Sequence, residues 1–290
     1  MTTDLPVSAP TPFADTAQTF TLLPGTVWLL RVDVGEDTQL DAVTGWLKVL
    51  SEAECQQVAR LKRPADRRAK AAAHALKRLA LAAIRQCSPE QLHFSALPSG
   101  KPCLVDGPAF NLSHTQGQVA LAIAAAGMEV GVDIEHRLYP RVDRELAVTA
   151  FGEQVAATLP DELSEHFAEA FFHQWTCREA VAKADGQGLG IGLERIQLYS
   201  EGQALGAQVD RQQWRLYCQD VSPCHRLALA IAGVAECDVS VVTLSARQLS
   251  NWCDDLHWLS GANLHSCQSR LKTVHSSAHS FFCQGRLPAL

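Results

Sequence analysis

The sequence predicts an α/β protein built from two similar halves. The pentapeptide ALAIA occurs at residues 120–124 and again at residues 228–232, each time as an apolar, strand-like run that follows a polar turn. The two copies lie roughly a hundred residues apart, a spacing that suits two α/β halves, although five small apolar residues can also recur by chance. Helical patterns at 66–86 and 162–184 place one long helix in each half.

Composition narrows the class of protein. The chain has 290 residues, of which 47% are hydrophobic and 19% charged, as in an ordinary soluble globular protein. Its formal net charge of -6 argues against a nucleic-acid partner. The ten cysteines include no C-x-x-C pair, so we expect reduced, partly buried thiols. Because the N-terminus lacks a secretory pattern and the longest apolar runs are too short to span a bilayer, we expect a cytoplasmic monomer without membrane contact.

Changes in amino-acid composition along the chain predict its domain boundaries. Residues 1–20, rich in Thr, Pro and Ala, are expected to form a flexible leader. The first half then covers residues 21–130, and the second half covers residues 131–245. Residues 246–290 are polar and lack a steady apolar period, which predicts a tail that is poorly ordered or peripheral. Four possible zinc ligands in that tail match no common finger spacing: Cys253, His257, His265 and Cys267.

In the first half, the helix expected from Asp66 to Gln86 begins in a basic cluster. Asp66 is a plausible N-cap, and an apolar stripe follows it at helical spacing. Six cations surround that single acid: Arg60, Lys62, Arg63, Arg67, Arg68 and Lys70. Such runs are often only solvated helix starts, but in a chain of negative overall charge the concentration is consistent with a phosphate ligand.

Two turns supply further groups that suit a phosphate. Lys101 lies in the turn SGKP, and Ser113 with His114 lies in NLSH, directly before the first ALAIA run. An ammonium, a hydroxyl and an imidazole can all donate hydrogen bonds to phosphate oxygens. A lone histidine in a turn is more often structural, so this interpretation depends on the other clusters.

Asp133 and Glu135, in the segment GVDIEHR, follow an apolar run at the start of the second half. On an extended strand these two residues point to the same face, while Val132 and Ile134 point to the other. Two converging carboxylates are costly without a cation. Most such pairs are merely solvated strand ends, so a metal site needs a further ligand.

The helix of the second half, expected from about Glu162 to Ala184, offers that ligand. Glu179 and Lys183 are four residues apart and share one face, as in an ordinary surface ion pair, but Trp175 lies on the same face. If this face packs against the end of the GVDIE strand, Glu179 joins the two earlier acids. Three carboxylates form a credible magnesium site, since this ion prefers hard oxygen ligands.

Four motifs in this order resemble the signature of the surfactin-type 4'-phosphopantetheinyl transferases: GKPCL, FNLSHTQGQVALAIA, GVDIE and FFHQWTCREAVAKADGQGLG. The resemblance covers roughly residues 55–235. It implies a pseudo-twofold fold of two α/β halves with coenzyme A in the cleft between them. It also implies that a magnesium ion on the coenzyme A pyrophosphate is held by three acids: Asp133, Glu135 and Glu179. Arg178 departs from the pattern, because the family commonly has Lys before that Glu.

The resemblance implies transfer of the 4'-phosphopantetheine arm of coenzyme A to a serine of an apo acyl, peptidyl or aryl carrier protein, with release of adenosine 3',5'-bisphosphate. Lys183 would steady or protonate the leaving phosphate, and Glu179 would take the serine proton. The coenzyme A phosphates would be held by a larger set: Arg63, Arg67, Arg68, Lys101, Ser113, His114 and Lys183. Two alternatives remain, a coenzyme A-binding regulatory protein without transfer activity and a magnesium-dependent phosphohydrolase.

Overall fold

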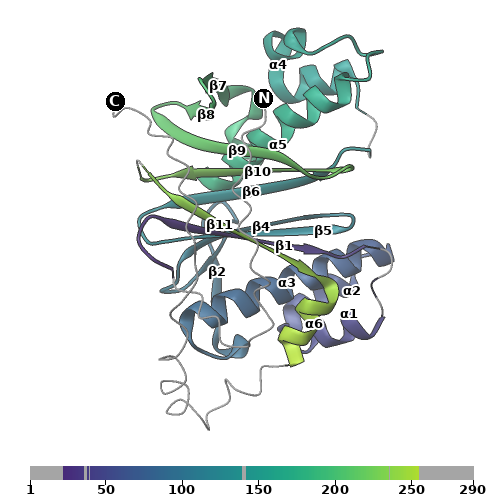
Figure 1. Ribbon diagram of the computed structural model, residues 1–290, viewed down its shortest axis with the longest axis vertical. Coiled ribbons are helices and arrows are strands. Elements are labelled where there is room, and N and C mark those ends of the chain that lie inside the picture. The colour runs from purple at the N-terminus through teal and green to yellow at the C-terminus, as the bar shows by residue number, and fades with distance from the viewer. Residues whose placement is uncertain (1–21, 36–37, 39, 139–141, 235, 255–290) are drawn as a thin grey trace, which may run out of the picture.

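Two sheets lie face to face between helical layers in the computed structural model (Figure 1). The structure describes residues 22–35, 38, 40–138, 142–234 and 236–254. The expected leader, residues 1–20, and most of the expected tail lie outside these residues. None of the described helices is long and apolar enough to cross a membrane.

The first sheet has the strand order β11-β1-β5-β4. Its strands are β1 (Thr26–Asp33), β4 (Ala109–Thr115), β5 (Gln118–Ala124) and β11 (Asp238–Ser245). The second sheet has the order β6-β10-β9-β8-β7. Its strands are β6 (Glu129–His136), β7 (Gln197–Glu201), β8 (Ala204–Val209), β9 (Gln212–Ser222) and β10 (His225–Ala232). A short hairpin joins β2 (Phe94–Ala96) to β3 (Pro102–Leu104).

The helices cover the outer faces of the two sheets. Beside the first sheet lie α1 (Leu40–Leu47), α2 (Glu52–Ala59), α3 (Pro64–Arg85) and α6 (Ala246–Asp254) (Figure 1). Beside the second lie α4 (Arg144–Thr158) and α5 (Phe167–Asp185). Helix α3 packs on β4 and β5, and α5 packs on β6 and β10, so each half repeats one helix on one antiparallel pair. The predicted α/β fold of two similar halves is confirmed.

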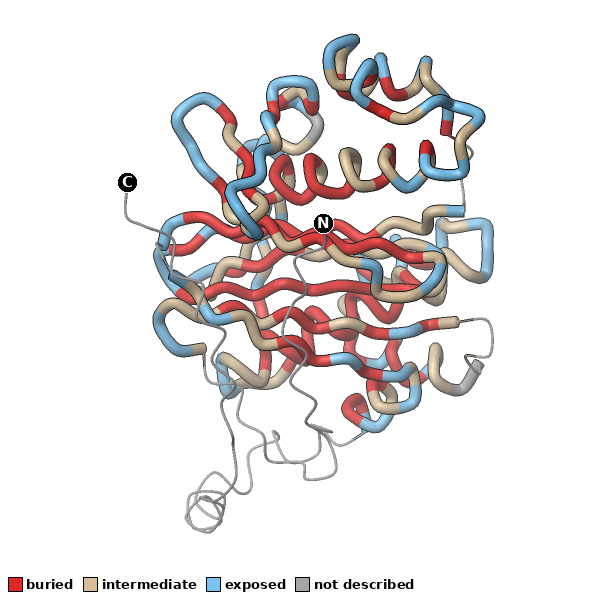
Figure 2. The backbone as a smooth tube through the Cα atoms, turned by 45° about the horizontal axis from the view of Figure 1, so that its top comes forward, coloured by how far each residue is buried: buried red, intermediate tan, exposed pale blue. Residues whose placement is uncertain are grey.

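Both ALAIA runs lie in central strands, β5 and β10, which are buried along their length (Figure 2). Their side chains nevertheless face opposite ways. In β5, Leu121 and Ile123 face the helices of the first half; in β10, Leu229 and Ile231 face the other sheet. The alanines of β10 face α5, where small side chains let the helix approach closely. The repeated letters are therefore out of register by one residue between the halves.

The last described strand and helix pack with the first half of the protein, which differs from the boundary between halves expected from the sequence. β11, counted by sequence with the second half, pairs in parallel with β1. Helix α6, expected to be peripheral, buries Leu249, Trp252 and Cys253 in the core of the first half. The reason is that β11 carries the chain back beside α1 and α3, where an apolar helix face is covered.

Two helix boundaries differ from the sequence prediction. Helix α3 begins at Pro64 with Arg63 as its N-cap, because proline is favoured in the first turn, where its missing N–H costs nothing. Helix α5 begins at Phe167, later than expected, and ends at Asp185, followed by Gly186, whose φ of 88° suits a left-handed C-cap.

Candidate active site

The edge strands of the two sheets, β4 and β6, meet through side chains. Asn111 and Ser113 project from β4 and accept hydrogen bonds from β6. The N–H of Val132 donates to Oδ1 of Asn111 at 2.9 Å, and the N–H of Ile134 donates to Oγ of Ser113 at 3.3 Å. The backbone N–H groups along the unpaired edge of β6 thus donate to polar side chains instead of to a further strand. This junction fixes Asp133, which lies between the two bonded residues.

Asp133 is buried at this junction, with 2% of its surface exposed. Its Oδ1 accepts a hydrogen bond from Oγ of Ser113 at 3.1 Å and another from Nζ of Lys183 at 2.5 Å. Its Oδ2 is buried and has no hydrogen-bond partner. A buried carboxylate oxygen without a partner is costly, so this atom suits a cation.

Helix α5 lies directly against β6 because Gly131 leaves room for it. A Cβ atom at Gly131 would lie 2.1 Å from the carbonyl oxygen of Ala180, so any larger residue would push the helix away. Close packing brings Trp175 to β6, and its Nε1 donates to Oε1 of Glu135 at 3.1 Å. Asp133 and Glu135 therefore both face α5, while Val132 packs between the sheets, as the strand alternation predicted.

The electrostatics show three acids opposed by one cation. Burial and the charge of Asp133 raise the pKa of Glu135 to about 7. Burial and Asp133 also raise the pKa of Glu179, against the opposing effect of Lys183. Burial lowers the pKa of Lys183, but Asp133 and the other acids outweigh it and leave the pKa raised. Excess negative charge and the unpartnered Asp133 oxygen fit a hard divalent cation such as Mg²⁺.

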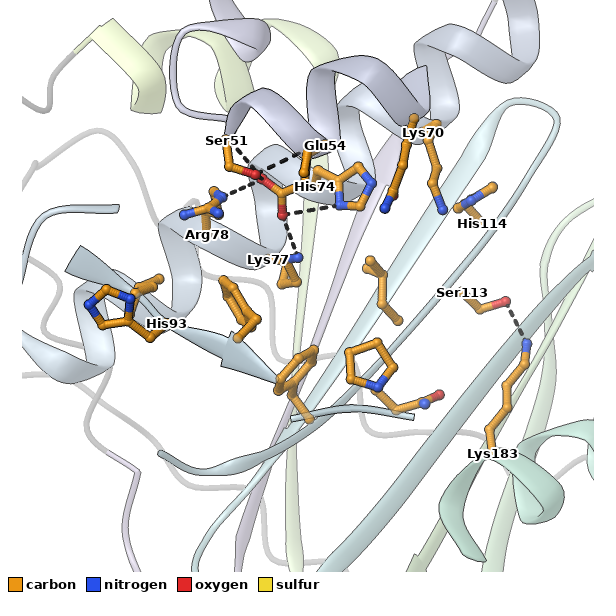
Figure 3. A pocket seen from close by; sticks show the side chains of 18 residues that line it. Ser51, Glu54, Lys70, His74, Lys77, Arg78, His93, Ser113, His114 and Lys183 are labelled. Carbon is orange, nitrogen blue, oxygen red and sulfur yellow. Dashed lines mark hydrogen bonds and ion pairs between the residues drawn. The ribbon is translucent and has the colours of Figure 1, made fainter. Parts of the chain in front are cut away.

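A cavity of about 650 Å³ opens beside these acids, between α2, α3 and β4 (Figure 3). Its lining includes many basic groups and a single acid, Glu54. The basic groups are Lys70, His74, Lys77, Arg78, His93, His114 and Lys183. Glu54 bonds Nζ of Lys77 at 2.7 Å and Nε of Arg78 at 2.5 Å. This one acid faces two cations, and Lys70 adds a third at the end of the cavity towards Lys183, so the lining keeps an excess of positive charge that favours an anionic ligand.

At that end of the cavity, Lys70 and His114 lie beside each other (Figure 3). Burial, followed by the charges of Lys70 and Lys183, lowers the pKa of His114 to about 4. The imidazole is therefore neutral near pH 7 and can donate one hydrogen bond. Ser113 adds a hydroxyl, which accepts from Nζ of Lys183 at 3.1 Å. The ammonium of Lys70 and the imidazole of His114 suit phosphate oxygens, whereas the single hydrogen of Ser113 is already donated to Asp133.

Lys101 is placed differently from the sequence prediction. Its ammonium donates to the carbonyl oxygen of Ala184 at 2.8 Å and to that of Val130 at 3.3 Å. It does not line the cavity. Because cations favour the carbonyl end of a helix, Lys101 fastens the C-terminus of α5 to the start of β6. Its contact with the site is indirect.

The arginines at the start of α3 also lie outside the described cavity lining. Arg67 donates to the carbonyl oxygens of Leu61 and Lys62, at 2.8 and 3.1 Å. Arg63 is the N-cap. Of the basic cluster at residues 60–70, Lys70 lines the cavity, although no separate role was expected for it from the sequence. Its signal was available: three basic residues recur at helical spacing on one face of α3, namely Lys70, His74 and Lys77.

The side chain of Arg178 is buried inside the second half of the protein. It is 2% exposed, its Nε donates to the carbonyl oxygen of Leu193 at 3.1 Å, and its guanidinium lies over the ring of Phe151 at 5.1 Å. Burial lowers its pKa to about 10. These contacts include none of the three acids, so in the structure Arg178 packs within the second half instead of contacting the candidate site.

Comparison with known proteins identifies the family to which this chain belongs. A family model described as the 4'-phosphopantetheinyl transferase superfamily matches residues 129–232. The chain is 31% identical over 200 residues to the putative 4'-phosphopantetheinyl transferase slr0495 of Synechocystis, covering 67% of this chain and 78% of that protein. It is 32% identical to HetI of Nostoc, covering 61% and 76%. The match to Sfp of Bacillus subtilis is more partial, at 30% identity over 41% and 53%.

Proposed function

Because the chain belongs to the 4'-phosphopantetheinyl transferase family, we propose that the junction of β4, β6 and α5 is its active site. The protein moves the 4'-phosphopantetheine arm of coenzyme A to a serine hydroxyl of an apo carrier protein and releases adenosine 3',5'-bisphosphate. One observation carries the assignment of the site: Asp133 is paired with Lys183 and interacts with the charges of Glu135 and Glu179, where a basic cavity ends.

Magnesium is the proposed metal. Asp133, Glu135 and Glu179 would hold it, supported by the unpartnered Oδ2 of Asp133 and by the raised pKa of both glutamates. When bound, the ion supplies positive charge that neutralises the pyrophosphate as its bond breaks. The chain alone offers too few cations at this point, since Lys183 is already paired with Asp133.

The cavity residues bind and orient coenzyme A in this proposal. Lys70 and His114 donate to its phosphates from α3 and β4, at the end of the cavity next to the acids. Ser113, which the sequence also assigned to a phosphate, gives its one hydroxyl hydrogen to Asp133 and so orients this acid and Lys183. Lys183 holds or protonates the leaving phosphate, and its raised pKa keeps it charged near pH 7. Alignment of this kind accounts for much of the rate in phosphoryl transfer.

Glu179 is the proposed general base for the carrier serine. Its pKa is raised by burial and by Asp133, which makes the carboxylate more basic than an ordinary glutamate. The proposed approach of the serine is from the side where Trp175, in the middle of α5, and Glu135, near the end of β6, are partly exposed. The proposed partner is an apo acyl, peptidyl or aryl carrier protein, and the chain is proposed to bind it as a monomer.

The test is a transfer reaction. The protein is incubated with coenzyme A, MgCl₂ and each of a panel of apo carrier proteins, and the carriers are weighed by mass spectrometry. We expect a mass gain of one phosphopantetheine group, lost when EDTA replaces MgCl₂ and restored by excess magnesium. Coenzyme A breakdown without carrier modification would contradict the proposal in favour of a hydrolase. Tight coenzyme A binding without any chemistry would favour a regulatory protein.

A further inference from the structure

A second cluster of potential metal ligands lies on the other side of α5. His173 and Cys177 come from α5, one turn apart, and Cys218 comes from β9. The ligand atoms of these three residues all lie within 4.8 Å of one another. Cys177 is two residues before Glu179, which on a helix places them about 200° apart, so the cluster and the candidate active site face opposite ways.

The spacing of these atoms matches that of ligands around one zinc ion. Nδ1 of His173 lies 3.5 Å from Sγ of Cys218. With a zinc–nitrogen bond of about 2.0–2.1 Å and a zinc–sulfur bond of about 2.3 Å, two tetrahedral ligands stand about 3.5 Å apart. The atoms therefore need little movement to coordinate a metal. Imidazole and thiolate are also ligands that zinc prefers, whereas Mg²⁺ prefers the oxygens of the other site.

Burial and charge both suit a divalent ion here. Cys177 is fully buried and Cys218 is 2% exposed, among apolar residues between α5 and the second sheet. Two thiolates would neutralise a divalent ion, so the loaded cluster would carry no net charge into this core. The hydrogen bond from Cys177, assisted by His173, lowers the pKa of Cys218 to about 5 against the effect of burial. The same hydrogen bond and burial raise the pKa of Cys177, which therefore carries the proton that zinc must displace. Arg226, which is held by Asp220 and Glu169, adds a stabilising positive charge.

We propose that His173, Cys177 and Cys218 bind zinc and fasten the outer side of α5 to β9. Zinc binding displaces the remaining thiol proton to solvent, leaving both sulfurs as thiolates. Three protein ligands leave a fourth tetrahedral position, which water fills from the side of the half-exposed His173. The site is separate from the proposed magnesium site and does not depend on the transferase reaction. Its effect on catalysis is positional, through the helix that carries Glu179 and Lys183.

Metal content tests this proposal without reference to activity. The full chain is purified under reducing conditions, loaded with ZnCl₂, passed through a desalting column and analysed by plasma mass spectrometry. We expect one equivalent of zinc, reduced at least tenfold in Cys218→Ser. Cobalt(II) loading should give a thiolate-to-metal charge-transfer band and the strong visible bands of tetrahedral coordination. His173→Gln, at a half-exposed position, should weaken cobalt affinity while circular dichroism shows an unchanged fold.

Three controls distinguish this site from other metal-binding groups. Cys87→Ser alters a cysteine at the end of α3, Cys267→Ser alters one of the C-terminal segment, and Asp133→Ala removes a proposed magnesium ligand. All three variants should retain the zinc and the cobalt spectrum. The proposal is overturned if the folded wild-type chain retains no zinc, or if Asp133→Ala or Cys267→Ser removes it. A Cys177–Cys218 disulfide in the reduced, zinc-loaded protein would also overturn it.

Discussion

The ammonium of Lys183 lies 2.5 Å from Oδ1 of Asp133 and links α5 to β6. The same ammonium lies 3.1 Å from Oγ of Ser113, which belongs to β4 of the first half. One side chain therefore joins the helix and strand of the second half to the edge strand of the first. The candidate active site exists only where both halves meet, so a change in their packing would disturb the acids and the phosphate-binding groups together.

Replacing the acids should remove transfer activity while preserving the fold. We expect Asp133→Ala or Glu179→Ala to lower turnover by roughly two orders of magnitude or more, because the charge that holds the metal is lost. Turnover is measured by carrier mass shift, and circular dichroism checks the fold. Glu153→Ala, at an exposed position of α4, is the matched control and should keep normal turnover. Near-normal transfer by a folded Asp133 or Glu179 variant would remove these residues from the mechanism.

The basic groups around coenzyme A can be separated by their Michaelis constants. Lys70→Ala should raise the KM for coenzyme A roughly tenfold, because it removes a charge-assisted hydrogen bond inside the cavity. Arg67→Ala should change it less than about twofold, since Arg67 is bonded to the carbonyl oxygens of its own loop.

Dephospho-coenzyme A, which lacks the 3'-phosphate, supplies the comparison for the arginines expected from the sequence to bind phosphates. Variants of Arg63, Arg67 or Arg68 that raise the KM for coenzyme A but leave dephospho-coenzyme A unaffected would restore that assignment. Equal effects on both substrates would exclude a contact with the 3'-phosphate.

The raised pKa of Glu135 predicts how stability depends on pH in the metal-free protein. The folded protein holds the Glu135 proton up to about pH 7, whereas an ordinary glutamate releases it near 4.5. Folding therefore takes up a proton between these values, and this group's contribution to stability falls as pH rises through that window. Glu135→Gln cannot ionise, so it avoids the loss of folding stability caused by a buried negative charge at this position.

Urea unfolding in EDTA measures this effect. The free energy of unfolding of Glu135→Gln should exceed that of wild type by roughly 1–3 kcal/mol at about pH 8 and by much less at about pH 5. Adding Mg²⁺ at the higher pH should stabilise wild type more than the variant, because an amide is the poorer ligand. A difference that is the same at both pH values would show that the Glu135 carboxyl is not perturbed.

Truncation tests where the folded unit ends. From sequence alone, a chain ending at Ser245 should stay soluble and active. The structure predicts the opposite, because Leu249 and Trp252 of α6 are buried in the first core. Loss of this helix should cost more than about 4 kcal/mol of unfolding free energy. A chain ending at Asp254 should keep its stability in urea and most of its transfer activity; equal stability of the two truncated chains would contradict this role for α6.

The sequence by itself determined the family and the acids of the candidate site. GVDIE reads as a strand whose alternate residues share a face, and the next long helix places Glu179 and Lys183 one turn apart. Both are local patterns, set by the periods of strand and helix. Spacing along the chain is sufficient for such inferences because each element has a fixed geometry.

Only the tertiary structure decided which distant groups meet. Lys101 reaches the end of α5, and Cys218 reaches His173 45 positions away in the chain, through contacts that no local period encodes. β11 returns to the first sheet because its backbone pairs with β1, which leaves α6 to cover that core. Long-range pairing and burial depend on how whole layers pack, so these placements follow from the fold and not from the order of residues.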